Sequence, residues 1–290
     1  MKHNINTFRQ LYYACKENNK TIYEIALDNE AAKGENSEYQ VRLQAKISLD
    51  AMKDAIKTGL SNTEPSPSGM SGDDCDKLQK SSAKFILGDT ARKIMTYALA
   101  TSEQNLRMGR IVACPTAGSC GIVPAVLIAF AEDNKISEND QINALITAGE
   151  VGRLVSNKMA LAGAVGGCQA ECGVASAMAT AALTQMRGGS VKQILNAVAL
   201  ALKNILGLTC DPVCGLVEIP CVKRNPFLAI HAVTASELAM ANIISKIPID
   251  EVVDAMEQTG QLMSPLLKES SQGGLAKTKT AIALEKNILK

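Results

Sequence analysis

Apolar residues recur at intervals of three and four along most of this chain, which is the spacing that places them on one face of an α-helix. Two N-terminal segments, residues 6–27 and 37–60, show this pattern with charged residues on the opposite face. A polar turn at residues 34–36 separates them. We therefore predict two amphipathic helices, which form an N-terminal helical hairpin over residues 1–60 and pack on a main body.

The main body, residues 61–290, continues the helical pattern with more apolar segments. Ser190 and Asp250 stand at the start of two of these segments, where each can cap the helix that follows. No run of any length alternates with the period of two that is typical of a strand, so an all-α fold is predicted: a multi-helix globular domain whose functional site is formed by loops between helices. The predicted helices of the main body cover residues 89–108, 137–162, 170–186, 191–206, 226–245 and 250–263, and one more begins near Ile122.

Composition supports a helical core and excludes two classes of partner. Of the 290 residues 47% are apolar, yet only 3% are aromatic and Trp is absent, so aliphatic side chains must fill the core. The net charge of +1 predicts binding neither to nucleic acid nor to an acidic membrane surface. The most apolar segment, residues 159–186, is mostly Ala and Gly and is interrupted by Glu171, which is typical of packed helices and not of a membrane span.

The cysteines indicate a reducing compartment. Nine cysteines cannot all pair with one another, and the first 20 residues contain no charged and then apolar leader. We therefore expect a cytoplasmic protein with reduced thiols. Reduced thiols of this kind are either small buried residues or ligands.

Two glycine-containing loops are candidates for binding a small anion. Residues 61–76 form a polar loop with two prolines and two glycines, which is long for a simple connector. Residues 115–121 form a turn just before an apolar helix, and free backbone amides at a helix start bind carboxylates or phosphates. The Lys of a nucleotide-hydrolase phosphate loop is missing there. The alternatives are a disordered linker for the first loop and a plain glycine turn for each.

A third segment, the cysteine loop of residues 210–221, carries thiols at both ends. Pro212 and Pro220 prevent a continuous helix through it, so an ordered loop is predicted. Together with Cys168, the thiols of Cys210 and Cys221 are candidate metal ligands. The C-x-x-x-C spacings in this region do not match the C-x-x-C of zinc ribbons or redox dithiols. From spacing alone, buried thiols, a structural zinc and an iron–sulfur site all remain open.

Three stretches carry a resemblance to a known family: GRIVACPTAGSCGIVPAVL, GGCQAECGVASAMA and LGLTCDPVCGLVEIPCVKRN. With SGMSGDDCDKL and QGGLA, they resemble the alpha chain of the bacterial iron–sulfur-dependent L-serine dehydratases, from about Ser68 onward and more loosely before it. The resemblance implies a 4Fe-4S cluster that is held by the thiolates of Cys168, Cys210 and Cys221, with the fourth iron open to substrate. Cys120, Cys172 and Cys214 are then assigned to packing near the cluster, and a spare thiol can serve as a reserve ligand.

The implied reaction is the β-elimination that converts L-serine into pyruvate and ammonia, in which the open iron acts as a Lewis acid on the substrate hydroxyl group. The substrate carboxylate needs fixed donors, for which we propose the two glycine-containing loops. No general base is assigned, because His231 lies within an apolar helix and is expected to be a satisfied core histidine. The predicted substrate-binding residues are Ser68, Gly69, Ser71, Gly72, Asp73, Thr116, Ala117, Gly118 and Ser119.

The resemblance also implies a partner chain. The Ser-His-Thr-containing glycine and proline motif of the family's beta part does not occur in this sequence. We therefore expect a hetero-oligomer with a beta subunit. The alternatives are a related iron–sulfur lyase that acts on L-cysteine or L-threonine and, from a different class, a non-catalytic thiol-rich partner subunit.

Overall fold

Helices make up almost all of the secondary structure in the computed structural model, which describes residues 5–34 and 36–288. Those ranges contain no extended strand, and one isolated bridge joins Cys210 to Lys268. The all-α fold is therefore confirmed. The α-helices are α1 Phe8–Asn18, α2 Ile22–Lys33, α3 Glu38–Ser61, α4 Asp74–Lys80, α5 Gly88–Leu106, α6 Ile122–Asn134, α7 Glu138–Ser156, α8 Gly163–Gly166, α9 Val174–Met186, α10 Val191–Lys203, α11 Cys221–Met240, α12 Ile249–Leu262 and α13 Lys279–Ile288.

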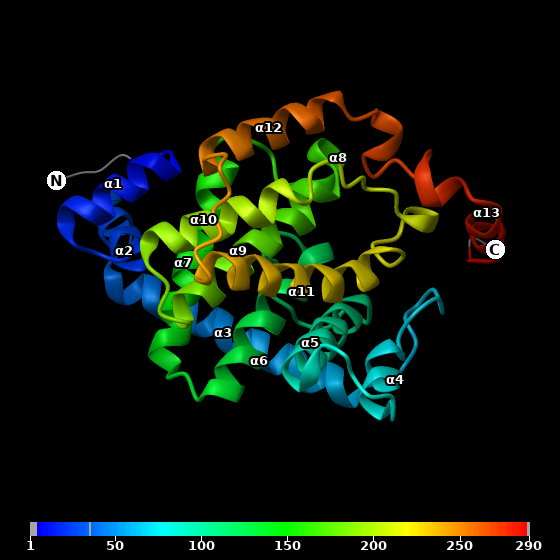
Figure 1. Cartoon of the computed structure of the whole chain (residues 1–290). Helices are drawn as coiled ribbons and strands as arrows, with labels where there is room; N and C mark the ends of the chain where they lie inside the picture. The colour runs from blue at the N-terminus through cyan, green and yellow to red at the C-terminus, as the bar shows by residue number, and fades with distance from the viewer. Residues whose placement is uncertain (1–4, 35, 289–290) are drawn as a thin grey trace.

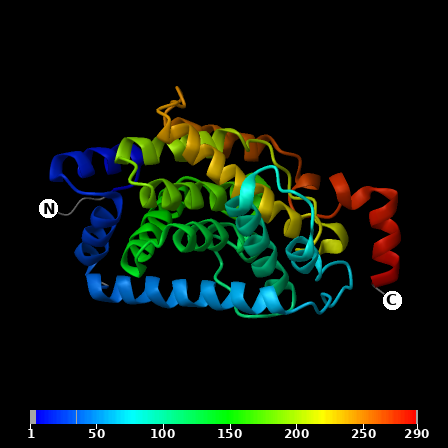
Figure 2. The same ribbon diagram turned by 60° about the horizontal axis from the view of Figure 1, so that its bottom comes forward.

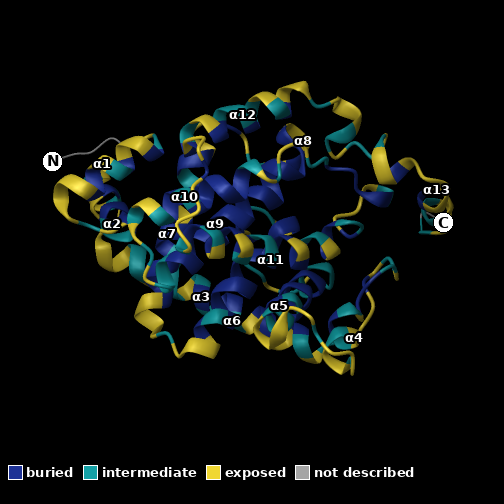
Figure 3. Ribbon diagram, in the orientation of Figure 1, coloured by how far each residue is buried: buried dark blue, intermediate teal, exposed yellow. Residues whose placement is uncertain are grey.

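Helix α9 lies at the centre of the bundle, where α6, α7, α10 and α11 pack around it (Figures 1 and 3). Every residue from Val174 to Thr184 is buried. Most of these residues are Ala, Ser or Thr, whose small side chains let the neighbouring helices approach closely. The close approach of the helices thus explains why the core contains few aromatic residues.

The N-terminal region differs from the predicted hairpin. The single helix predicted over residues 6–27 is wrong, because α1 ends in a left-handed residue, Asn19 (φ 51°), and α2 begins at a capping box of Thr21 and Glu24. A capping box binds backbone amides that would already be hydrogen-bonded inside a continuous helix, so it marks the start of a second helix. Helix α3 is confirmed, with Ser37 as its cap. Glu35, in the turn predicted at residues 34–36, lies outside the described residues. The predicted boundary between the N-terminal hairpin and the main body at residue 60 stays a prediction.

The predicted role of Asp250 as the cap of its own helix is also wrong. Pro248 stands at the N-cap of α12, and no side chain caps that helix. The carboxylate of Asp250 instead accepts hydrogen bonds from the backbone amides of Phe8 and Arg9, both 2.9 Å long, at the start of α1. The predicted cap at Ser190 is confirmed. Asp250 thus joins the first turn of α12 to the start of α1 by satisfying amides that α1 leaves free.

Several helices begin or end at other residues than predicted. Helix α11 begins at Cys221, five residues before the predicted start, and contains Pro226 within its first turns. Helix α7 ends at Ser156, short of the predicted 162. The segment before α9 forms a π-turn, η2, over Gln169–Gly173. Single π-turns inside helices occur frequently at functional sites.

The irregular segments gather at one end of the bundle, opposite the N-terminus. The loop before α4, the loop before α11 and the segment that leads to α13 all lie there (Figures 1 and 2). The short 3-10 helices η3 Val213–Gly215, η4 Pro265–Leu267 and η5 Gly274–Lys277 belong to these connections, whereas η1 Ala117–Ser119 lies between α5 and α6. Among the described helices, none combines the length and the apolar character needed to cross a membrane.

Candidate functional site

The thiol groups that were predicted to bind a metal come from three separate elements. Cys168 directly precedes η2 and is fully buried, Cys210 lies in the loop that follows α10, and Cys221 is the first residue of α11. Gly167 before Cys168 has φ 76°, and a Cβ atom there would lie 2.9 Å from the carbonyl oxygen of Leu208. Glycine is therefore needed for the chain to bring Cys168 against the cysteine loop.

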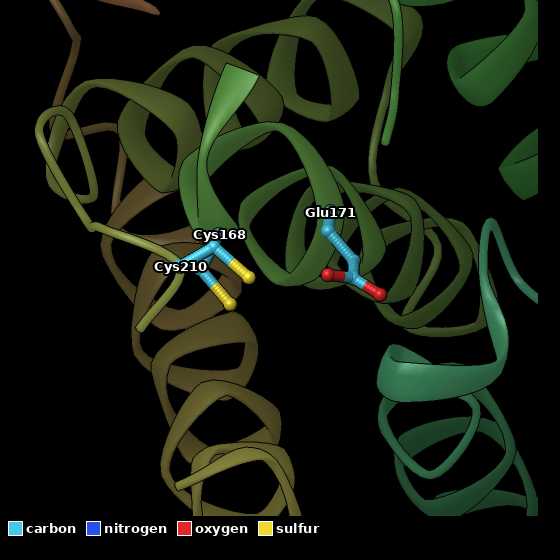
Figure 4. A group of neighbouring side chains, drawn as sticks. All are labelled: Cys168, Glu171 and Cys210. Carbon is cyan, nitrogen blue, oxygen red and sulfur yellow. The ribbon is translucent and has the colours of Figure 1, made fainter. Parts of the chain in front are cut away.

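The side chains of Cys168 and Cys210 lie side by side with their sulfur atoms pointing the same way, and the carboxylate of Glu171 lies on that side (Figure 4). All three ligand atoms lie within 4.8 Å of one another, and all three residues are buried. The Sγ atom of Cys172 lies 3.7 Å from that of Cys168. The thiol of Cys221 is buried as well, but it is not one of the three groups that lie within 4.8 Å of one another.

Glu171 is the residue that the sequence analysis missed. It was noted only as an interruption of an apolar segment, although a lone carboxylic acid three residues after Cys168 points to the same side of a helical turn. Its Oε1 accepts a hydrogen bond from the hydroxyl group of Thr116. A Cβ atom at Gly163 would lie 2.9 Å from both Glu171 Oε2 and Cys210 Sγ, so the glycine leaves room for the two groups to meet.

Burial and mutual charge shift the pKa values at this site. Burial foremost, with the negative charge of Cys168 added to it, raises the pKa of Glu171 to about 7, against the lowering effect of the Thr116 hydrogen bond. Hydrogen bonds from the thiols of Cys172 and Cys210 lower the pKa of Cys168 and raise their own. Burial raises the pKa of Cys221 to about 12. The site therefore favours one thiolate, at Cys168, beside protonated neighbours.

Arg224 supplies a positive charge next to these thiols. Its guanidinium group donates to the carbonyl oxygen of Thr209 and to Asp211 Oδ1, both at 2.8 Å, and it contributes to lowering the pKa of Cys168. Asp211 Oδ2 also accepts from the amide of Leu275, at 2.9 Å. The QGGLA segment is therefore attached to the cysteine loop. Side-chain exposure of 16% for Arg224 and 6% for Asp211 makes this a largely buried ion pair.

The first predicted loop, residues 61–76, is shorter in the structure, because α3 ends at Ser61 and α4 begins at Asp74. The remaining residues 62–73, which we call the serine loop, lie against the cysteine loop. The hydroxyl groups of Ser66 and Ser68 each donate to Glu218, at 2.5 Å. Of the predicted residues, Ser71 and Gly72 are buried, whereas Gly69 and Asp73 are exposed. Ser71 Oγ has no hydrogen-bond partner among the described residues.

The second predicted substrate loop is in direct contact with the thiol site through Thr116. A Cβ atom at Gly118 would lie 2.6 Å from Glu171 Oε1, so the backbone passes close to that carboxyl group. Asn225 of α11 holds the loop by donating to the carbonyl oxygen of Gly118 and accepting from the amide of Gly121, both at 2.9 Å. Ala117 and Ser119 complete the short η1 turn. This loop therefore contacts the thiol site directly, through the side chain of Thr116. The serine loop instead contacts Glu218 of the cysteine loop.

The remaining thiols and the histidine have different surroundings. Cys172 belongs to the site, whereas the Sγ atom of Cys120 lies 4.0 Å from the carbonyl oxygen of Thr101 in α5. Cys214 is partly exposed, in a left-handed conformation with φ 58°. His231 Nδ1 lies 2.9 Å from Ser176 Oγ, as expected for a satisfied core histidine, and burial lowers the pKa of His231.

The fold and the site together define an all-α protein with a buried, thiol-rich candidate metal centre. Such donors, two thiols and a carboxylic acid in close contact with further thiols nearby, are suited to iron or zinc. Thr116 of the η1 turn contacts Glu171 among these donors, and the serine loop contacts the cysteine loop that contains Cys210.

Comparison with known proteins identifies the family. The family model described as "Serine dehydratase alpha chain" matches residues 17–276. The probable L-serine dehydratase alpha chain of Bacillus subtilis (strain 168) is 43% identical over 282 residues, which are 97% of this chain and 94% of that one. The L-serine dehydratase alpha chain of Peptoniphilus asaccharolyticus is 39% identical over 288 residues, 99% of each chain. The chain belongs to the serine dehydratase alpha chain family, and the predicted family and enzyme class, a lyase, are confirmed.

Some relatives are longer single chains. An L-serine dehydratase of Escherichia coli (strain K12) is 43% identical over 63% of this chain, and the match covers 41% of the E. coli protein. An L-serine dehydratase of Streptomyces coelicolor is 34% identical over 95% of this chain and 61% of its own length. These relatives contain sequence that has no counterpart in the matched part of this chain.

Proposed function

We propose that this chain is the alpha chain of an L-serine dehydratase, which converts L-serine into pyruvate and ammonia by β-elimination. The single observation that carries the proposal is the meeting of buried Cys168, Cys210 and Glu171 within 4.8 Å, in a chain of the serine dehydratase alpha chain family. Relatives that cover almost the full chain are named L-serine dehydratase alpha chains.

The proposed cofactor is a 4Fe-4S cluster held by the thiolates of Cys168, Cys210 and Cys221. These residues fit such a group, because thiolates are its usual ligands and the glycines at 163 and 167 leave room where the segments meet. When bound, a cluster with one open iron supplies a Lewis acid for the substrate hydroxyl group. Arg224 places a positive charge beside the thiolates and offsets part of their negative charge.

The chain's own groups bind the substrate and hold a proton at the site. Backbone amides of the serine loop and of the η1 turn bind the carboxylate of L-serine, as free amides at glycine-rich turns do. Glu171 holds a proton on its carboxyl group, which Thr116 orients toward the thiol site. The buried surroundings exclude water and thereby strengthen each of these contacts.

A beta subunit is the proposed partner, in a cytoplasmic hetero-oligomer. The longer single-chain relatives support this, because their additional sequence is present in one polypeptide with the part that matches this chain. A beta subunit would supply the corresponding sequence as a separate chain. Covering the end of the bundle where the three loops gather would complete a water-excluding site.

Anaerobic reconstitution tests the proposed function. Full-length protein treated with ferrous iron and sulfide, with and without a beta subunit, should show broad brown absorption, bind iron and acid-labile sulfide, and form pyruvate from L-serine. The substitutions Cys168→Ser, Cys210→Ser and Cys221→Ser should each abolish iron binding, while Cys214→Ser, at the partly exposed position, should retain it. Stoichiometric zinc in colourless protein would contradict the proposal.

The same assay separates the alternatives. Release of sulfide from L-cysteine, or of 2-oxobutyrate from L-threonine, at a higher kcat/KM than pyruvate from L-serine would assign a related lyase. Iron-loaded protein that turns over none of the three substrates, even with a beta subunit, would indicate a non-catalytic thiol-rich subunit.

A further inference from the structure

Glu218 is a buried carboxylate in the cysteine loop, and neither the reaction nor the proposed ligand set uses it. Its exposure is 2%. Both of its carboxylate oxygens accept hydrogen bonds from hydroxyl groups of the serine loop, Oε1 from Ser66 and Oε2 from Ser68, each at 2.5 Å. The residues in these pairs are 152 and 150 positions apart. A buried carboxylate requires partners, and here two hydroxyl groups from a distant loop provide them.

The serine side of this contact is ordered by its own hydrogen bonds. The hydroxyl groups of Ser66 and Ser68 lie 3.0 Å apart, and Ser68 Oγ accepts from the amide of Met70 at 3.1 Å. The amide of Ser66 donates to the carbonyl oxygen of Ser71 at 2.8 Å, which closes the loop. Fixing the two hydroxyl groups therefore fixes the whole turn that contains the predicted substrate-binding residues.

The glutamate side is equally well anchored. The carbonyl oxygen of Glu218 accepts from the amide of Val222 at 3.0 Å, in the first turn of α11, next to the thiol of Cys221. The amide of Val213 donates to the carbonyl oxygen of Ile219 at 2.8 Å and closes the cysteine loop. The carboxylate thus extends from a short, hydrogen-bonded segment that also positions a proposed metal ligand.

We propose that Glu218 is a positioning residue: the Ser66–Glu218–Ser68 cluster fixes the serine loop against the cysteine loop and so sets the distance between the carboxylate-binding amides and the thiol site. This inference rests on the proposed function for its catalytic part. The hydroxyl group of Ser68 donates its hydrogen bond to Glu218. In this loop, backbone amides and not the Ser68 side chain therefore bind the substrate carboxylate.

Other contacts keep the serine loop folded when the cluster is removed. Arg107, which follows α5 as its C-cap, donates to the carbonyl oxygens of Glu64, at 2.7 Å, and of Gly72. Lys223 of α11 pairs with Asp74 at 2.5 Å, just beyond the loop. We therefore expect loss of Glu218 to loosen the loop without unfolding the protein.

The test compares Glu218→Gln and the double variant Ser66→Ala/Ser68→Ala with the wild-type chain. Glutamine has nearly the same size but offers one uncharged acceptor in place of two charged ones, which weakens the hydrogen bonds. Hydrogen exchange of the amides at residues 62–73, measured on the full-length chain without iron, should become about tenfold faster in both variants. Glu237→Gln, in an exposed ion pair on α11, is the matched control and should change nothing in this loop.

Kinetics on the reconstituted enzyme distinguish positioning from a general structural role. Both variants should raise KM for L-serine by about tenfold, with a smaller fall in kcat and unchanged iron content. Unchanged exchange in the loop would overturn the inference, and so would loss of iron with unchanged KM, which would assign Glu218 to holding Cys221. If the wild-type enzyme binds iron but does not act on L-serine, the proposed function fails, and the exchange experiment alone decides whether the cluster fixes the loop.

Discussion

The hydroxyl group of Thr116 donates a hydrogen bond to the carboxyl group of Glu171, and this contact joins two segments that are 55 positions apart. It connects the η1 turn to the π-turn that follows Cys168, within the candidate site. The carboxyl group is buried and its pKa is raised to about 7, so its orientation depends on few partners. Thr116 is therefore placed to decide where Glu171 can hold a proton relative to the thiols.

Replacing Thr116 with Val should lower kcat for L-serine by about tenfold or more, because a buried carboxyl group loses the hydroxyl that orients it, a loss of about 1.5–3 kcal/mol. Thr116→Ser keeps the hydroxyl group and should retain most of the activity. Both variants should bind iron as the wild type does, as measured by iron and sulfide content. Equal kcat values for Thr116→Val and the wild type would show that Glu171 does not depend on this contact.

The contact between α12 and the start of α1 gives a prediction about stability. Asp250→Ala should lower the free energy of unfolding by about 1 kcal/mol, because the amides of Phe8 and Arg9 lose their acceptor at the start of α1. Urea denaturation of the iron-free protein measures this. Asp254 lies on the same helix as Asp250 and forms an exposed ion pair with Lys158. Asp254→Ala should therefore lower the free energy of unfolding by less than about 0.5 kcal/mol. The prediction fails if the two variants are equally stable.

Helices were predictable from the sequence because their signals are local. Apolar spacing indicated α3 and α10, and Ser37 and Ser190 mark their starts with capping boxes. A capping box within a periodic segment was overlooked, which is why residues 6–27 were predicted as one helix. Local signals thus sufficed for the fold class, but they did not separate α1 from α2 and did not give the bounds of α7 and α11.

Contacts between residues far apart in the sequence, including those of the candidate site, were not predictable in the same way. Glu171, Asp250 and Glu218 each have partners 55 or more positions away, so no spacing in the sequence reveals the contact. Burial decides their roles as well, since Glu171 has an ordinary side chain whose pKa is raised only by its surroundings. The thiols could be proposed as ligands because cysteine is a distinctive ligand type, whereas a carboxylate is not.

His231 gives a pH prediction. Burial lowers its pKa below the ordinary value of 6.5, so the unfolded chain binds a proton at a pH where the folded chain does not. This group therefore reduces stability as the pH falls below about 6.5 and contributes no change above it. The free energy of unfolding of the iron-free wild type should fall more steeply between pH 7 and pH 5 than that of His231→Gln. Parallel curves for the two proteins would contradict a lowered pKa.

Gly163 tests whether the close approach of Cys210 and Glu171 is required for metal binding. In Gly163→Ala the new Cβ atom would lie 2.9 Å from Cys210 Sγ and from Glu171 Oε2, so both groups must move. Because these are side-chain ends and not backbone, the iron-free protein should lose only about 1–3 kcal/mol of stability, as other overpacked sites do.

The metal site should suffer far more, because its geometry depends on the displaced sulfur. We expect iron content after anaerobic reconstitution to fall at least severalfold in Gly163→Ala, with a proportional loss of pyruvate formation. Gly149→Ala in α7 is the matched control: its Cβ atom would meet nothing within 4 Å, and Ala should stabilise the helix by up to about 1 kcal/mol. Full iron content in Gly163→Ala would mean that Cys210 can bind the metal from another position, and the proposed arrangement of ligands would then be wrong.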